Sequence, residues 1–135
     1  MLLVLYLMQN KDVQRKAQQE LDSVVGTERL PTWDDIPNLP YTNLVLQETY
    51  RMNPLSPLGI PHASVADDVY NDMFIPKGTI VYQNVWAMHH DESIYADPFR
   101  FHPERYLSKE EGGLGEPLPV GNFGFGRRYE ASADS

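Results

Sequence analysis

A chain of 135 residues holds at most one domain, and its 11 prolines and 9 glycines divide it into short elements. The formal charge of −8 disfavours binding to nucleic acid or to an anionic membrane surface, so we expect neither partner. The chain has no cysteine, which excludes disulfides, zinc–cysteine sites and any thiolate nucleophile or metal ligand.

The first 25 residues carry the patterns of two helices. Residues 1–9 are apolar on nearly every side, which is typical of a buried helix, and they are too few to span a bilayer. A second helix is predicted to begin at Asp12, acting as its N-cap, and to run to about Val25, where Gly26 ends it. Its apolar positions recur at helical spacing, so we expect an amphipathic packing helix.

A third helix is predicted after a short turn. Thr32–Asp35 is a capping-box variant that predicts one helical turn closed by Pro37. Pro40 can occupy the first position of the next helix, which reaches to about Met52, and Pro54 follows it.

Two charged residues lie beside the apolar stripe of this third helix. Glu48 and Arg51 are three positions apart, so their side chains can meet. From spacing alone the default interpretation is a solvated ion pair of little energetic value. Their place beside the stripe, rather than opposite to it, favours a partly buried pair.

The middle of the chain reads as an extended connector followed by strands. The prolines between Pro54 and His62 disfavour helix, and His62 by itself is an ordinary loop histidine. Residues 63–66, 69–75 and 79–84 predict two or three short strands in one small sheet, with a turn at Asn71–Asp72.

Three further segments complete the chain up to its glycine-rich end. A short helix is predicted at Asn84–Met88. His89–Glu92 could suggest a metal site, but adjacent residues point apart, so we expect an exposed polar turn. Ser108–Pro119 is rich in glycine and glutamate and is expected to be a flexible surface loop.

The segment from Gly121 to Arg128 combines three glycines, two aromatics and two arginines. Glycine allows close approach of the backbone to a bulky group, and arginine can bind a carboxylate or phosphate through two hydrogen bonds. The segment is therefore expected to hold a large, partly anionic ligand. A nucleotide phosphate is an alternative, although the spacing matches neither usual phosphate-binding pattern.

This loop resembles the cysteine-ligand loop of the haem-thiolate monooxygenases, the cytochromes P-450, whose pattern is Phe-x-x-Gly-x-Arg-x-Cys-x-Gly. Phe123, Gly126 and Arg128 match it in register. Glu130 stands where the cysteine belongs, and Ser132 stands where the last glycine belongs. The resemblance thus stops at the residue that would bind iron.

Two more motifs carry the same resemblance in the expected order. Glu48-x-x-Arg51 matches the Glu-x-x-Arg signature of the family, and residues 103–106 resemble its Pro-Glu-Arg-Phe segment. The resemblance makes Arg105 the third member of a network with Glu48 and Arg51, whereas from its local sequence it would be an exposed loop arginine. It runs from about Leu2 to Arg128 and is nearest to the microsomal, eukaryotic type.

The resemblance implies a mainly α fold with a small β-sheet. It covers part of the cytochrome P-450 fold, from the end of the oxygen-binding helix to the start of the haem-binding loop. In that family, haem and an NADPH-dependent reductase insert one oxygen atom from O2 into a small organic substrate at the endoplasmic reticulum membrane. No membrane span is expected in this chain.

The same resemblance assigns roles to individual residues. Arg128 and His62 are expected at the haem propionates, and Phe123 and Gly126 are expected in the loop that holds the haem. The substrate side would be formed by Leu58, Gly59 and Ile60. We assign no catalytic and no metal-ligating residue to this chain.

The missing thiolate limits what this chain can do. A thiolate pushes electron density toward bound oxygen, and the hard carboxylate of Glu130 cannot replace it. We therefore expect an incomplete domain at residues 1–128 that binds no haem through a thiolate. Residues 129–135 are expected to be an unrelated tail from a shifted frame or splice. A non-catalytic, poorly folded remnant or interaction fragment is the alternative.

Overall fold

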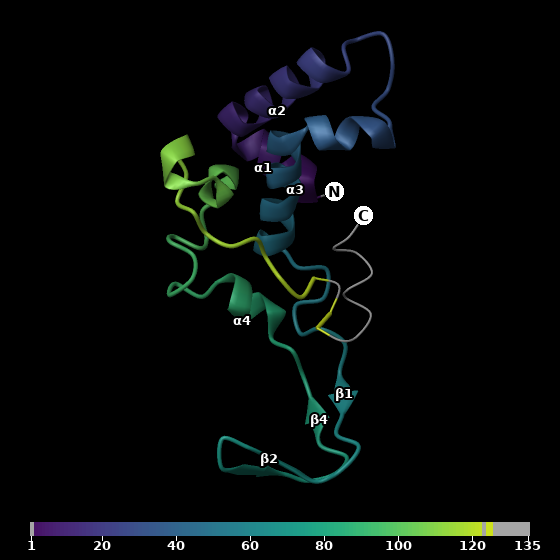
Figure 1. The fold of residues 1–135 in the computed structure, drawn as a ribbon, viewed down its shortest axis with the longest axis vertical. Coiled ribbons are helices and arrows are strands. Elements are labelled where there is room, and N and C mark those ends of the chain that lie inside the picture. The colour runs from purple at the N-terminus through teal and green to yellow at the C-terminus, as the bar shows by residue number, and fades with distance from the viewer. Residues whose placement is uncertain (1, 123, 126–135) are drawn as a thin grey trace.

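The computed structural model describes residues 2–122 and 124–125 and shows a mainly helical chain with small sheets (Figure 1). Helices α1, α2 and α3 gather at one end, and the strands extend from the other. The elements in chain order are α1 (Leu2–Gln9), α2 (Lys11–Val24), the 3₁₀ helix η1 (Trp33–Asn38), α3 (Pro40–Met52), β1 (His62–Ala63), β2 (Asp68–Tyr70), β3 (Met73–Ile75), β4 (Ile80–Val81), α4 (Val85–His89), and the 3₁₀ helices η2 (Pro103–Tyr106) and η3 (Lys109–Glu111).

The hydrophobic core lies where the first three helices meet the segment before η2. Val13 and Ala17 of α2 pack with Val45 of α3 and with Phe101. Tyr6 of α1 stacks on Phe101, with ring centroids 4.7 Å apart. The predicted apolar face of α2 is thus the face that supplies the core, as expected for an amphipathic helix.

Two helix boundaries differ from prediction. The N-cap of α2 is Asn10, because the carbonyl of Asn10 already accepts from Gln14, and Asp12 therefore falls in the first turn. Thr32 forms the predicted capping box with Asp35, but Pro37 lies inside η1 instead of closing it. Proline has a backbone angle close to that of a 3₁₀ helix, so one proline costs this short element a single hydrogen bond.

The start of α3 is held by a residue that the sequence did not point to. Pro40 is its first residue, as predicted, and has no amide proton to satisfy. The next two amides, of Tyr41 and Thr42, donate to the two carboxylate oxygens of Glu20 in α2, at 2.8 and 2.7 Å. A negative charge at a helix N-terminus is favourable, so Glu20 also fixes α2 against α3.

Helix α1 forms as predicted but is only half covered. Leu3, Tyr6 and Leu7 pack against the core. The opposite face exposes Leu2, Val4, Leu5 and Met8, each between 47% and 61% accessible. No helix in the described part of the chain is long and apolar enough to cross a bilayer.

The strands form two separate pairs, whereas one small sheet was predicted. β1 pairs antiparallel with β4, placing His62 opposite Val81. β2 pairs with β3 around a turn at Asn71–Asp72, where both residues have positive φ, of 49° and 62°. Asparagine and aspartate tolerate this conformation, which a tight hairpin turn needs. The predicted turn is therefore confirmed, while each strand is shorter than its apolar run.

The last third of the described chain contains two capped helices, one of them in a segment that was predicted to be a flexible loop. Helix α4 is capped by Asn84, whose side chain accepts from the amide of Ala87. The segment predicted to be a flexible loop begins with η3, where Ser108 and Glu111 form a capping box. That Ser-x-x-Glu pattern is visible in the sequence and is the signal that the loop prediction overlooked.

Shortening a core side chain at Val45 tests the packing of α3 against α2. Val45 is 3% exposed, so Val45→Ala removes buried methyl groups and leaves a cavity. We expect a loss of about 2 kcal/mol of unfolding free energy, measured by urea denaturation. Val65→Ala is the matched control because Val65 is 89% exposed. Equal denaturation midpoints for the two variants would contradict this position of the core.

Candidate functional site

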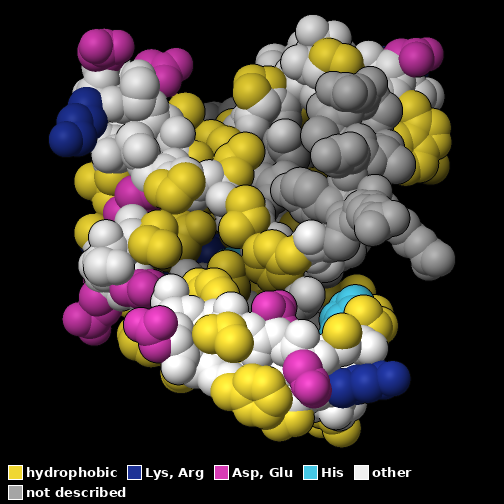
Figure 2. Space-filling view, turned by 60° about the horizontal axis from the view of Figure 1, so that its bottom comes forward, with side chains coloured by type: hydrophobic (Ala, Val, Ile, Leu, Met, Phe, Trp, Pro, Cys, Tyr) yellow, Lys and Arg dark blue, Asp and Glu magenta, His cyan; other side chains and the backbone are white. Residues whose placement is uncertain are grey.

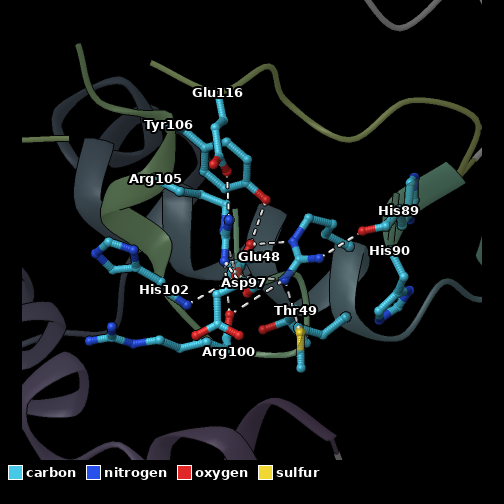
Figure 3. A network of polar contacts seen from close by, with 12 residues as sticks. Glu48, Thr49, His89, His90, Asp97, Arg100, His102, Arg105, Tyr106 and Glu116 are labelled. Atoms are coloured by element: carbon cyan, nitrogen blue, oxygen red, sulfur yellow. Dashed lines mark hydrogen bonds and ion pairs between the residues drawn. The ribbon is translucent and has the colours of Figure 1, made fainter. Parts of the chain in front are cut away.

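Three charged side chains from two distant parts of the chain meet between α3 and η2 (Figure 3). Glu48 and Arg51 lie one turn apart on α3, and Arg105 comes from η2. All three residues have no exposed surface. The two arginines approach opposite sides of one carboxylate, which is an arrangement that burial makes costly unless every donor and acceptor is paired.

The Glu48 carboxylate is the centre of this arrangement and accepts five hydrogen bonds. Arg51 donates through Nε at 2.8 Å and Nη2 at 3.0 Å, and Arg105 donates through Nε at 3.0 Å. The amide of His102 and the hydroxyl of Tyr106 complete the set, at 3.0 and 2.6 Å. Both carboxylate oxygens are therefore fully used.

Backbone carbonyls take up the remaining guanidinium protons. Nη1 of Arg51 donates to the carbonyl of His89 at 2.7 Å. Arg105 donates to carbonyls in the turn before η2, namely those of Ala96 at 2.9 Å, Asp97 at 3.2 Å and Arg100 at 3.0 Å. In this turn Asp97 has a φ of 47°, a left-handed conformation that aspartate tolerates better than most residues.

A second carboxylate, which the sequence did not single out, joins the network. Nη1 of Arg105 also donates to Oε2 of Glu116 at 2.5 Å, and Oε1 of Glu116 accepts from the amide of Ala96 at 2.8 Å. Burial alone would lower the pKa of Arg105, but the hydrogen bond that Arg105 donates to Glu116 and the charges of Glu48 and Glu116 raise it. Charge balance is the sequence signal that could have indicated a second carboxylate such as Glu116, because two buried guanidiniums are compensated by two carboxylates.

Two aromatic residues enclose this charged centre. Burial raises the pKa of the Tyr106 hydroxyl well above its usual range, and the neighbouring Glu48 charge raises it further. The hydroxyl therefore stays protonated and serves as a donor. On the other side, the guanidinium carbon of Arg51 lies 5.2 Å from the ring centre of Tyr95. An aromatic face is a favourable neighbour for a desolvated cation.

The histidine pair at the end of α4 is buried, so the prediction of an exposed polar turn is wrong for these two residues. His89 is 1% and His90 is 9% exposed. His90 stacks on Trp86 one turn earlier, with ring centres 4.4 Å apart. Nε2 of His89 lies 2.8 Å from the carbonyl of Val120, to which it can donate. The helical turn places the His90 ring on Trp86 and the His89 ring beside the carbonyl of Val120, contacts that the sequence spacing alone did not reveal.

The residues predicted for the substrate side lie on an exposed connector between α3 and β1. Leu58 and Ile60 are 52% and 73% exposed, and His62 begins β1 with its side chain exposed. Gly59 has a φ of 64°, and a β-carbon there would come within 2.9 Å of the Gln83 side chain. The connector is tied to α4, because the amide of Trp86 donates to the carbonyl of Pro57 at 3.0 Å.

Only the beginning of the glycine–aromatic loop is described. Phe123, Gly126 and Arg128 lie outside the described residues. Gly121 has a φ of 85°, and a β-carbon at this position would overlap the ring of Phe125. Phe125 also lines an open hollow of about 570 Å³ next to α4, together with Tyr82, Gln83, Asn84, Ala87, Met88 and Asp91.

Comparison with known proteins decides the family. The sequence pattern of the cytochrome P450 family matches residues 1–129. This chain belongs to the cytochrome P450 family. The cytochrome P450 monooxygenase ple1 of Rhodocybe pseudopiperita is 52% identical over 120 residues, which are 87% of this chain and 23% of that protein. The cytochrome P450 monooxygenase 105 of Postia placenta is 52% identical over 128 residues, which are 93% of this chain and 24% of that protein.

Solved cytochrome P450 structures agree with this assignment. A zebra fish cytochrome P450 structure with progesterone aligns with a TM-score of 0.81 and 36% identity, over 93% of this chain and 28% of that one. The chain therefore spans about a quarter of the length of the curated relatives it matches. The resemblance predicted from the motifs is confirmed, and the fold is part of the cytochrome P450 fold.

The residues present do not fit the haem ligation of the family. In cytochromes P450 a cysteine thiolate binds the iron, and this chain contains no cysteine. Among the described residues, no group of three or more histidine, aspartate or glutamate side chains is placed to bind a metal. The chain thus has the buried network that precedes the loop, but it lacks the cysteine thiolate that the loop of the family provides as the iron ligand.

Neutralising the central carboxylate tests the network. Glu48→Gln keeps the shape of the side chain but leaves two buried guanidiniums with one carboxylate fewer. We expect a loss of about 3 kcal/mol or more in unfolding free energy, measured by urea denaturation. Glu28→Gln is the control because Glu28 is exposed. A Glu48→Gln chain as stable as this control would show that the charge is dispensable.

Acidification is expected to weaken the fold through His89. Burial lowers the pKa of His89 below its ordinary value of 6.5, and the nearby charges of Arg51 and His90 act in the same direction. The unfolded chain then binds a proton more readily than the folded chain. The unfolding free energy should therefore fall as pH drops below about 6.5, by at most about 1.4 kcal/mol per pH unit, until His89 itself is protonated.

Urea denaturation between pH 7.5 and 5 measures this slope. His89→Gln should flatten it, since glutamine does not titrate. His62→Gln should leave it unchanged, because the His62 side chain is exposed. The same slope in the His89→Gln chain would assign the effect to another group.

Proposed function

We propose that this chain is the haem-side scaffold segment of a haem-dependent monooxygenase. The observation that carries the proposal is the fully buried Glu48 carboxylate between Arg51 and Arg105, in a chain of the cytochrome P450 family. In the whole protein the segment would hold the haem loop, and haem would support insertion of one oxygen atom from O2 into an organic substrate. Electrons would come from an NADPH-dependent reductase at the endoplasmic reticulum membrane.

Individual residues take their proposed roles from the family. Arg128 and His62 would bind the haem propionates, and Leu58–Ile60 would lie on the substrate side. The exposure of His62 and of the connector is consistent with ligand contact in a complete protein, because both remain accessible in this chain. The buried network would then act as a brace and would not touch haem itself.

This chain is not expected to bind haem through a thiolate. Glu130 stands at the position of the ligand, and a carboxylate is a harder donor than a thiolate. Titration with haemin, followed by reduction and carbon monoxide, should give no Soret band of the thiolate type. A chain in which Glu130→Cys restores the donor is the matched comparison. A clear thiolate-type band from the unaltered chain would refute this expectation.

A second candidate function is supported by the exposed apolar surface. Large hydrophobic side chains are spread over the chain, and Figure 2 shows many of them on one face. Among the described residues, the buried cluster at the helical end consists of Val13, Ala17, Val45 and Phe101. So small a core favours a non-catalytic fragment with little stability of its own.

Circular dichroism separates the two candidates. A scaffold segment that folds alone should show helical ellipticity and one cooperative thermal transition. A remnant should show weak ellipticity and a gradual change on heating. Glu48→Gln provides the reference, because loss of the buried charge should lower the transition temperature of a folded chain and leave the gradual change of a remnant unaltered.

A further inference from the structure

The segment between η3 and the glycine–aromatic loop is attached to the buried network at both of its ends. At its start, the amide of Glu116 donates to the carbonyl of Arg105 at 3.0 Å, and that of Gly115 donates to Leu107 at 2.8 Å. At its end, the carbonyl of Val120 lies 2.8 Å from Nε2 of His89. Since the carbonyl of His89 accepts from Arg51, both attachments lead to the same pair of arginines.

Glu116 is the member of this segment that carries charge into the network. Its side chain is 9% exposed, and its Oε2 lies 2.5 Å from Nη1 of Arg105. Glu48 and Glu116 contribute two negative charges, and Arg51 and Arg105 contribute two positive charges. Without Glu116 the buried group would keep one uncompensated positive charge, which is unfavourable in a dry environment.

Neighbouring carboxylates are engaged elsewhere and do not substitute for it. Glu111 accepts from the amide and hydroxyl of Ser108 at the start of η3. Glu104 accepts from Lys16 at 2.5 Å and from the hydroxyl of Tyr41 at 2.9 Å, on the side of α2. Of these three, Glu116 is the one that accepts a hydrogen bond from Arg105, and Figure 3 shows this pair from close by.

We propose that Glu116 is a positioning residue. It neutralises the buried Glu48–Arg51–Arg105 group and thereby fixes the position of residues 115–120 and of Gly121, which follows them at the start of the loop. The side chain acts through Arg105 and the amide of Ala96. The consequence for haem binding rests on the proposed function. The effect on the position of the segment does not.

Amide hydrogen exchange measured by NMR on the unaltered chain and its variants tests this proposal without haem. Glu116→Gln keeps the shape of the side chain and removes its charge. We expect the amides of Gly115 and Glu116 to exchange about tenfold faster or more, because a charge-assisted hydrogen bond restrains local opening. Amides of α3, such as those of Val45 and Thr49, should keep their rates. Glu111→Gln is the control and should affect η3 only.

A conservative variant separates positioning from general stability. Glu116→Asp retains the charge and should restore most of the protection at Gly115 and Glu116. If Glu116→Gln unfolds the whole chain, Glu116→Asp still allows the exchange of these amides to be measured in a folded variant. The proposal is overturned by unchanged exchange in Glu116→Gln, by equal acceleration in α3 and residues 115–120 for both variants, or by no protection at 115–116 in the unaltered chain. A failed haem experiment leaves these outcomes unaffected.

Discussion

The structure depends on one interaction, the burial of the Glu48 carboxylate between two guanidinium groups. A charge without water is tolerated only when its hydrogen-bonding capacity is satisfied, and here five donors surround the carboxylate. Each donor comes from a defined position of α3 or of the turn around η2. The electrostatic requirement therefore dictates how a helix and a turn 57 residues further along must meet.

This requirement also explains why irregular backbone is well defined in the last third of the described chain. The turn before η2 has little regular structure, yet three of its carbonyls bind Arg105. The glycine-rich segment after η3 also contacts Arg105, because its Glu116 accepts a hydrogen bond from that side chain. Apolar packing contributes as well, since Val85, Tyr95 and Phe101 are buried in the same part of the chain. Polar contacts to Arg105 and apolar burial together hold this backbone in place.

The sequence predicted local features well where a single chemical rule applied. Pro40 marked the start of α3, and the Asn71–Asp72 turn was visible from its residues. Glu48 and Arg51 could be paired from their spacing, whereas Arg105 needed the family resemblance. Glu116 and the buried state of His89 could not be read from local patterns, because both depend on contacts between segments that are distant in sequence.

Helix α4 has a mechanical consequence because it is bound at both ends. Its Trp86 amide holds the connector at Pro57, and its His89 carbonyl holds Arg51, three residues further along a five-residue helix. A displacement of the connector at Pro57 would therefore be passed along one short helix to the carbonyl that Arg51 binds, so the connector and the charged centre are joined without a contact through the hydrophobic core cluster of the described residues.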